Sequence, residues 1–266
     1  MAPMDLKDTR AILRRHRISP SKISGQNFLV DESVAKREVE AADIKSSEVV
    51  LEIGPGLGAL TEHLLKKGCR VIAIEKDPSL IKILKERLSS DNLEVINADV
   101  LEVNLPSFDV VVSNIPYVIS SPLTFKLLEH RFSRGVLAYQ EEFALRLTAR
   151  PGEYDYSRLS VAAYYYTEAE ILETIQPRAF FPQPKVKSAV VRLTPKTRPP
   201  FKVDKDRFFK LLRGMFTVKK KTVRNAVLIA KKVEGVEVDL DRIPESLLGK
   251  RAFELSPEEI ALIANL

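Results

Sequence analysis

Apolar and polar positions alternate along the chain with two different periods, one typical of helices and one typical of strands. A helical spacing covers residues 6–15, and a second helix is predicted from the N-cap residue Asp31 to about Ala42. Short apolar runs then predict strands at 48–53, 70–74, 93–96, 108–112 and 135–139. Amphipathic segments between and after them predict helices at 57–67, 79–88, 122–130 and 141–149. This alternation predicts an α/β fold, a Rossmann-like parallel sheet with helices on both faces.

The pattern of predicted elements changes after residue 194. Alternating runs at 162–175 and 188–193 predict two late strands, and the proline-rich stretch 194–200 reads as a linker. Only helices are predicted beyond it, at 206–215, 222–232, 244–248 and 257–263. We therefore expect two domains, residues 1–197 and a small helical domain over residues 198–266.

Composition narrows the class of protein. Hydrophobic residues make up 45% and charged residues 29% of the 266 residues, a balance typical of folded proteins. The single cysteine, Cys69, cannot form an internal disulfide, which suits a reducing cytoplasm. No stretch approaches 18 uninterrupted apolar residues, so no membrane span is expected. The three histidines, His16, His63 and His130, lack metal-ligand spacing, so no metal site is expected.

A glycine-rich loop follows the first predicted strand of the sheet. Gly54, Gly56 and Gly58 alternate where that strand passes into a helix. Glycines allow a sharp turn and let a ligand lie against the main chain, beside the free N–H groups of a helix start. A dinucleotide site would show the spacing G-x-G-x-x-G. The spacing G-x-G-x-G instead favours the methionine end of S-adenosylmethionine.

Two carboxylates end the next two predicted strands. Glu75 comes 17 residues after Gly58, where a carboxylate can accept both ribose hydroxyls of a nucleoside ligand. Asp99 ends the third strand, where it can accept a hydrogen bond from an adenine amino group. Each has a simpler interpretation, a solvated strand end for Glu75 and a loop cap for Asp99. Together with the glycine loop they favour a nucleoside-containing cofactor.

The most specific signal is the tetrapeptide from Asn114 through Ile115 and Pro116 to Tyr117, which ends the fourth predicted strand. The exocyclic amine of adenine is a poor nucleophile, because its lone pair is delocalised into the ring. The Asn114 side-chain oxygen and the Ile115 carbonyl can accept its two hydrogens and return electron density to the nitrogen. Pro116 makes the turn rigid, and Tyr117 offers a ring on which the base can stack.

These motifs together resemble the ribosomal RNA small-subunit adenine dimethyltransferases, the KsgA/Dim1 family. Five separated segments carry the resemblance in the family's order: 25–31, 54–61, 114–117, 179–186 and 188–191. The match runs from about residue 18 to residue 194. The chain departs from the family at Gln140-Glu141-Glu142 and Tyr156-Ser157, outside these motifs.

The resemblance implies roles for individual residues. Asn114, Tyr117 and Phe180 are expected to be catalytic, the two rings clamping a flipped adenine. The expected contacts to S-adenosylmethionine are Asn27, Leu29, Gly54, Gly56, Glu75, Asp99 and Asn114. The family transfers two methyl groups to each of two adjacent adenosines near the 3′ end of small-subunit rRNA. Its substrate is an immature subunit, so rRNA and that particle are the expected partners of a monomeric, cytoplasmic enzyme.

Positive charge gathers beyond the predicted linker. The net charge of +6 is modest, but Lys219, Lys220, Lys221 and Arg224 form a dense basic run. Such a run can neutralise RNA phosphates, so these four residues are candidates for substrate binding alongside Ile115 and Pro116. The alternative is an ordinary solvated helix face.

Two other functions share much of this pattern. One is an adenine-N6 methyltransferase that acts on large-subunit rRNA or on DNA, because the motif chemistry is the same. The other is a binding protein with a methyltransferase fold that serves as a transcription or ribosome-assembly factor. The basic helical tail and the segment 180–186 favour small-subunit rRNA over the first alternative. The intact motif from Asn114 to Tyr117 argues against a purely structural role.

Overall fold

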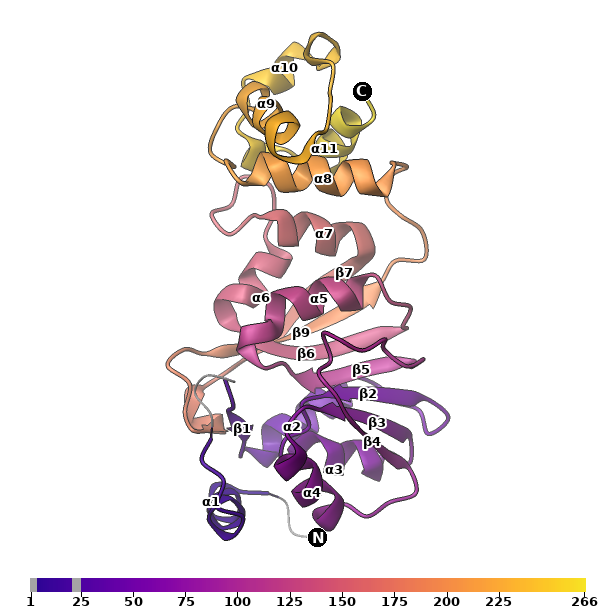
Figure 1. Ribbon diagram of the computed structural model, residues 1–266, viewed down its shortest axis with the longest axis vertical. Helices are drawn as coiled ribbons and strands as arrows, with labels where there is room; N and C mark the ends of the chain where they lie inside the picture. Colours follow the sequence, from indigo (N-terminus) through magenta and orange to yellow (C-terminus); the bar gives the residue numbers. More distant parts are fainter. Residues whose placement is uncertain (1–3, 21–24) are drawn as a thin grey trace. The chain divides into compact units, whose positions relative to one another are not determined.

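The computed structural model describes residues 4–20 and 25–266 and contains a seven-stranded sheet (Figure 1). The strands lie in the order β4-β3-β2-β5-β6-β9-β7. Their bounds are β2 Val49–Ile53, β3 Arg70–Glu75, β4 Leu93–Asn97, β5 Val110–Asn114, β6 Arg134–Gln140, β7 Thr167–Ile175 and β9 Ser188–Pro195. β2 to β6 pair in parallel, and β9 runs antiparallel to β6. The α/β fold expected from the sequence is confirmed.

Helices cover both faces of this sheet. Val50, Val110 and Val112 share one buried cluster with residues of α2 (Glu32–Ala41) and α3 (Ala59–Lys66). α4 (Pro78–Arg87) packs on Ala73 of β3. Ala73 lies two residues from Val71, which belongs to the cluster beneath α2 and α3, so α4 covers the same face as these two helices. α5 (Ser120–Leu128) covers the opposite face, where its Thr124 hydroxyl donates to the Tyr139 hydroxyl at 2.9 Å.

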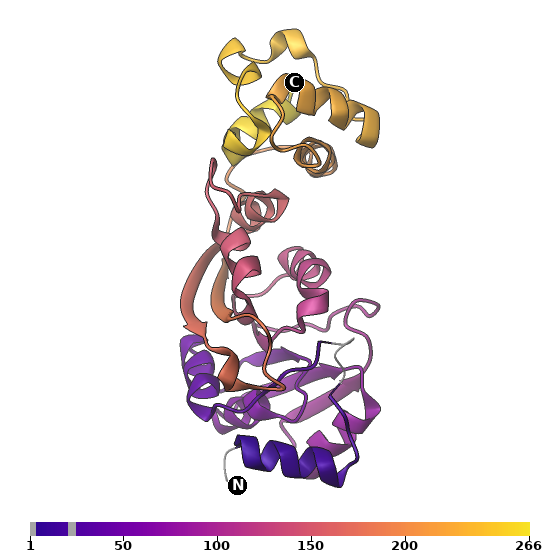
Figure 2. The same cartoon turned by 90° about the vertical axis from the view of Figure 1, so that its left-hand side faces the viewer.

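The N-terminal segment is tied to a late part of the chain. α1 (Leu6–Arg15) is capped by the Asp5 side chain, which accepts from the Asp8 amide. The short strand β1 (Phe28–Leu29) then pairs antiparallel with β8 (Phe180–Phe181), Leu29 opposite Phe180. Figure 2 shows this indigo segment beside the orange one. Residues far apart in sequence are thereby brought to the same edge of the site described below.

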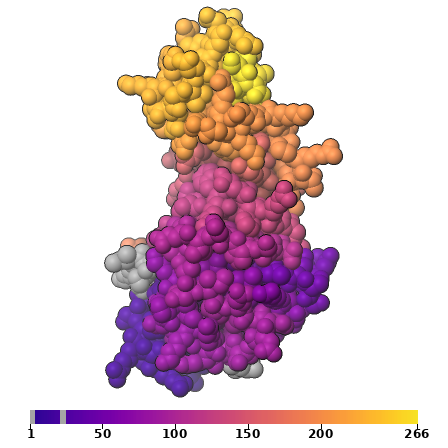
Figure 3. Space-filling view, turned by 45° about the vertical axis from the view of Figure 1, so that its right-hand side comes forward, coloured from indigo at the N-terminus to yellow at the C-terminus, as the bar shows by residue number. Residues whose placement is uncertain are grey.

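The chain divides into two compact units, Met1–Ala144 with Glu168–Pro195 and Leu145–Thr167 with Lys196–Leu266. The second unit contains α7 Arg158–Tyr166, α8 Lys205–Phe216, α9 Val223–Glu234, α10 Glu245–Leu248 and α11 Pro257–Ala264. Its core joins Tyr156 and Val161 to apolar residues of α8, α9 and α11. In Figure 3 the yellow end of the chain lies among the gold and orange atoms of the preceding helices. Residues 145–167 therefore belong with the C-terminal helices, although the sequence places them within 1–197.

The sequence interpretation of residues 162–166 as strand is wrong. α7 continues to Tyr166, and β7 begins only at Thr167. Helix initiation at Ser157, whose amide donates to the Ser160 hydroxyl at 3.0 Å, and burial of one face outweigh the β propensity of the aromatic residues. The remaining short elements are α6 Glu141–Thr148 and the 3₁₀ turns η1 Tyr117–Ile119, η2 Pro177–Ala179, η3 Leu240–Arg242 and η4 Ala252–Glu254.

Within residues 4–20 and 25–266, no helix combines the length and the apolar character that crossing a membrane requires.

Candidate active site

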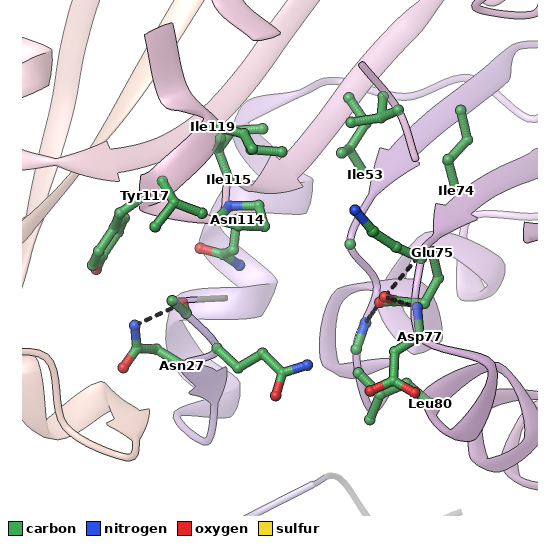
Figure 4. Close-up of a pocket in the computed structure, with 18 of the residues that line it drawn as sticks. Asn27, Ile53, Ile74, Glu75, Asp77, Leu80, Asn114, Ile115, Tyr117 and Ile119 are labelled. Carbon is green, nitrogen blue, oxygen red and sulfur yellow. Dashed lines mark hydrogen bonds between the residues drawn. The ribbon is translucent and has the colours of Figure 1, made fainter. Parts of the chain in front are cut away.

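A cavity of about 360 Å³ opens at the carboxyl ends of the central strands. The chain runs outward from β2 to β3 and β4, then returns to β5 on the other side of β2, so the strand order reverses between β2 and β5. Ligands of open α/β sheets bind at such a switch point. The predicted site residues that line the cavity are Asn27, Gly54, Gly56, Glu75, Asp99, Asn114, Ile115, Pro116, Tyr117 and Phe180. Figure 4 shows Asn114 and Tyr117 on one side of it and Glu75, Asp77 and Leu80 on the other.

The glycine loop has a backbone that only glycine adopts easily. Gly54, Gly56 and Gly58 have φ angles of 64°, 57° and 86°, all in the left-handed region. A Cβ on Gly58 would lie 2.6 Å from the Leu84 side chain, and one on Gly56 would lie 3.2 Å from the Phe28 ring. Because Gly58 is left-handed, α3 begins at Ala59 rather than at the expected Leu57. At Gly54 and Gly56 the loop therefore presents main chain without side chains to the cavity.

Glu75 is buried at the end of β3 and is held by three backbone amides. Its Oε1 accepts from the Lys76 and Asp77 amides at 2.9 and 3.0 Å, and its Oε2 accepts from the Gly56 amide at 3.3 Å. Burial raises the pKa of this carboxyl, and the three amides oppose that rise. Oε2, with one long hydrogen bond, keeps acceptor capacity for hydroxyl groups in the cavity.

Asp99 caps a loop and also lines the cavity. It lines the cavity, and its Oδ1 also accepts from the Leu101 amide at 2.9 Å, which caps the loop. Its Oδ2 pairs with the Lys76 ammonium at 2.7 Å, and this hydrogen bond lowers the pKa of Asp99. Asp99 is therefore a carboxylate anchored at the rim of the cavity.

Asn114 ends β5 with its amide oriented by a buried neighbour. Its Nδ2 donates to the Glu38 Oε2 at 3.1 Å, whereas its buried Oδ1 has no hydrogen-bond partner among the described residues. A buried amide oxygen without a partner is unfavourable in the free protein. Asn114 also lines the cavity, which makes this oxygen a candidate acceptor for a ligand.

Two aromatic rings line the same cavity. Tyr117 is half-buried in η1, and its hydroxyl is 2.6 Å from the Ser188 Oγ. Burial raises the pKa of the Tyr117 hydroxyl, so it stays neutral. Phe180 is only 4% exposed because β8 holds it against β1 and the core of the sheet. The sequence singled out both rings, whereas the contact with Ser188 gave no sequence signal.

Leu29 lies apart from the main cavity. Its side chain packs into the core, and it lines a smaller void of about 50 Å³ together with Asn27, Glu52 and Asn114. Phe28, which the sequence did not single out, lines the main cavity instead. Alternation along an extended segment explains this difference, since neighbouring side chains of β1 point to opposite faces.

The basic run lies in the second unit, at the start of α9. Lys220, Lys221 and Arg224 are exposed. Lys219 is half-buried and donates to the Tyr154 and Tyr156 carbonyls at 2.8 and 2.9 Å, and burial lowers its pKa. Lys219 therefore fastens a loop of its own unit, and the other three residues are the ones available to a polyanion.

The residues that line the cavity fit the predicted cofactor in their polar and apolar groups. The glycine loop supplies a wall without side chains, Glu75 supplies a buried acceptor, and Ile74, Leu80 and Val100 supply apolar surface for a base. Among the residues that the structure describes, no group of three or more His, Cys, Asp and Glu side chains could hold a metal ion.

A family model described as ribosomal RNA adenine dimethylase matches residues 20–257. The chain is similar to the probable ribosomal RNA small subunit methyltransferase A of Methanosarcina barkeri, with 44% identity over 96% of this chain and 90% of that protein. Its counterpart in Methanopyrus kandleri is also 44% identical, over 94% of this chain and 93% of that protein.

Two solved structures are similar over most of the chain. A dimethyladenosine transferase from Plasmodium falciparum has a TM-score of 0.76 and 34% identity, covering 89% of this chain and 95% of that one. The 23S rRNA methyltransferase ErmE has a TM-score of 0.71 and 31% identity, covering 90% of this chain and 98% of that one.

Proposed function

Because the chain belongs to the ribosomal RNA adenine dimethylase family, and is thus an rRNA adenine dimethyltransferase that uses S-adenosylmethionine, we propose a specific substrate for it. That substrate is a pair of adjacent adenosines near the 3′ end of small-subunit rRNA, within an immature small subunit. We further propose that the protein works in the cytoplasm as a monomer. The small-subunit names of the archaeal relatives support this choice over large-subunit rRNA, the substrate in the name of ErmE.

The observation that carries the proposed chemistry is the buried, unpartnered Asn114 Oδ1 beside the cavity. We propose that this oxygen and the Ile115 carbonyl accept the two N6 hydrogens of a flipped adenine. Accepting both hydrogens makes the nitrogen lone pair more available at the moment of attack. Tyr117 and Phe180 hold the base by stacking once it has left the RNA stack.

The remaining cavity residues fit cofactor binding. Glu75 would accept the ribose hydroxyls, and the glycine loop would lie against the methionine portion. When bound, S-adenosylmethionine supplies a methyl group that its sulfonium makes electrophilic. Asp99 would accept from the adenine amino group through the acceptor capacity left beside Lys76.

A methyl-transfer assay tests the substrate. Radiolabelled S-adenosylmethionine is supplied with immature small subunits, mature small subunits, large-subunit rRNA or duplex DNA. We expect labelling of the immature subunit, with dimethyladenosine at two adjacent positions after digestion and mass spectrometry. Labelling of large-subunit rRNA or of DNA in preference would contradict the proposed substrate.

Removing either stacking ring is expected to abolish most activity and to leave cofactor affinity intact. Base–aromatic stacking contributes roughly 1–3 kcal/mol per base, so Tyr117→Ala should lower kcat/KM for RNA by about 5- to 150-fold. Phe180→Ala should do the same, but its ring is also a core residue, so unfolding must be measured in parallel. Tyr117→Phe is the control that keeps the ring. Phe180→Leu is the control that keeps a large apolar side chain but removes the ring. A loss of cofactor binding in Tyr117→Ala would contradict the stacking role.

Neutralising the exposed cations of the second unit should flatten the salt dependence of RNA binding. The variant combines Lys220→Gln, Lys221→Gln and Arg224→Gln and spares Lys219, which is engaged internally. If each cation neutralises one phosphate, the slope of log K against log salt falls by roughly 2 to 3 units. A control that removes three charges elsewhere combines Lys36→Gln, Lys66→Gln and Lys67→Gln. Equal slopes for the wild type and the first variant would exclude this segment from the RNA site.

A further inference from the structure

A buried carboxylate lies directly behind the proposed catalytic amide. Glu38, on α2, is 1% exposed, and its Oε2 accepts from the Asn114 Nδ2 at 3.1 Å. Its other oxygen, Oε1, is buried without a hydrogen-bond partner among the described residues, as is the Asn114 Oδ1. Glu38 does not line the cavity, so it reaches a substrate only through Asn114.

The contact decides which end of the amide faces a ligand. A side-chain amide can turn so that its oxygen and its NH₂ group exchange places, and only one of the two orientations offers an acceptor to an adenine amine. An ionised carboxylate has no hydrogen to donate. It therefore pairs with the NH₂ group and leaves Oδ1 for the cavity. No other described contact of the Asn114 side chain selects this orientation.

We propose that Glu38 is a positioning residue for methyl transfer: its carboxylate holds the Asn114 amide with Oδ1 available to the N6 amine of the target adenine. This inference rests on the proposed role of Asn114 as the amine acceptor. It assigns to Glu38 no contact with the base, the cofactor or the transferred methyl group.

The positioning depends on the protonation state of Glu38. Burial is the main cause that raises the pKa of Glu38 to about 8, and the charges of Glu173 on β7 and Glu52 on β2 add to it, while Asn114 and Arg37 oppose it. A protonated Glu38 can donate to Oδ1 of a turned amide and so compete with the substrate amine for that oxygen. Ionisation removes this competition, so kcat should rise as the pH increases through the pKa of Glu38.

The kinetic test compares pH profiles of kcat at saturating cofactor. Wild type should show a rising limb with a midpoint near the pKa of about 8 given by the environment of Glu38. Glu38→Gln does not titrate, and its amide can pair with Asn114 in either orientation. We expect the limb to vanish and kcat at high pH to fall about tenfold, the loss of one hydrogen bond to a charged group. Glu38→Ala should fall at least as far, with cofactor affinity unchanged.

Two matched variants separate Glu38 from its neighbours. Glu52 is also buried with a pKa raised to about 8, but it accepts from the Thr61 hydroxyl and not from Asn114. Glu52→Gln should therefore keep the limb, and its disappearance there would overturn the proposal by assigning the titration to Glu52. Glu173→Gln removes a negative charge near Glu38 and frees Arg37, which pairs with Glu173 at 2.9 Å. Both changes lower the pKa of Glu38, so the limb should move to lower pH.

A structural readout distinguishes failure of this inference from failure of the proposed function. The side-chain amide signals of Asn114, identified by their absence from Asn114→Ala, are followed by ¹⁵N NMR. They should shift with pH in the wild type and not in Glu38→Gln, whether or not Asn114 takes part in catalysis. If Asn114→Ala is inactive while every Glu38 variant keeps the wild-type kcat and pH profile, the positioning role is excluded and the role of Asn114 stands. If the amide signals follow Glu38 but Asn114→Ala is fully active, the proposed function fails instead.

Discussion

Asn114→Ala is expected to lower kcat about 10²- to 10³-fold, the loss typical of removing one preorganised group that stabilises a transition state. The effect belongs in kcat because the amine becomes a stronger hydrogen-bond donor only as it attacks and gains positive charge. The buried Oδ1 is already oriented in the free protein, so little reorganisation accompanies the reaction. Turnover of rRNA at saturating cofactor measures this directly.

The same substitution has a structural consequence that must be measured beside it. Alanine leaves the buried Glu38 without its one described hydrogen-bond donor, and an unsatisfied buried group costs about 1–3 kcal/mol. A lower Tm is therefore expected, with the fold retained. Calorimetric titration with S-adenosylmethionine shows how far Asn114 also contributes to cofactor binding. Near-normal turnover of a folded Asn114→Ala protein would refute the assignment of Asn114 as the amine acceptor.

The sequence was sufficient for the parts of the site that lie at strand ends. Gly54, Glu75, Asp99 and Asn114 follow successive apolar runs, and parallel strands bring their carboxyl ends to one edge of the sheet. Topology alone therefore predicts that they meet. Phe180 has no such local signal, and it was found only through the family resemblance of the segment around it.

The contacts that orient these residues were not predictable from the pattern. Glu38 lies on a helix 76 residues before Asn114, and Ser188 lies 71 residues after Tyr117. A glutamate in an amphipathic helix ordinarily faces solvent, so the sequence does not reveal that Glu38 is buried against Asn114. The helix α7 escaped prediction for a related reason: its apolar face is defined by a core that includes α8, α9 and α11, far along the chain.

Glu75→Ala is expected to weaken S-adenosylmethionine binding about 100-fold. Each hydrogen bond from a ribose hydroxyl to the carboxylate contributes about 1.5–3 kcal/mol. Water replaces part of these two interactions in the variant, so we expect a net loss of about 3 kcal/mol of binding free energy. The substitution also removes the acceptor for the Gly56, Lys76 and Asp77 amides, which loosens the glycine loop and adds to the loss. Calorimetric titration gives the Kd, and thermal unfolding checks that the sheet remains folded.

The pH dependence of that affinity separates the charge of Glu75 from its structural contacts. Protonation turns one of the two acceptor oxygens of Glu75 into an O–H donor and removes the negative charge, so affinity should fall as the pH is lowered through the pKa of Glu75. Because burial raises this pKa above its ordinary value of 4.5, the fall should begin at a higher pH than an exposed glutamate would give. Glu75→Gln keeps the size and one acceptor but does not titrate, so it should bind more weakly than wild type and show no such fall. An affinity of Glu75→Gln that equals wild type and shares its pH profile would remove the carboxylate from the ribose site.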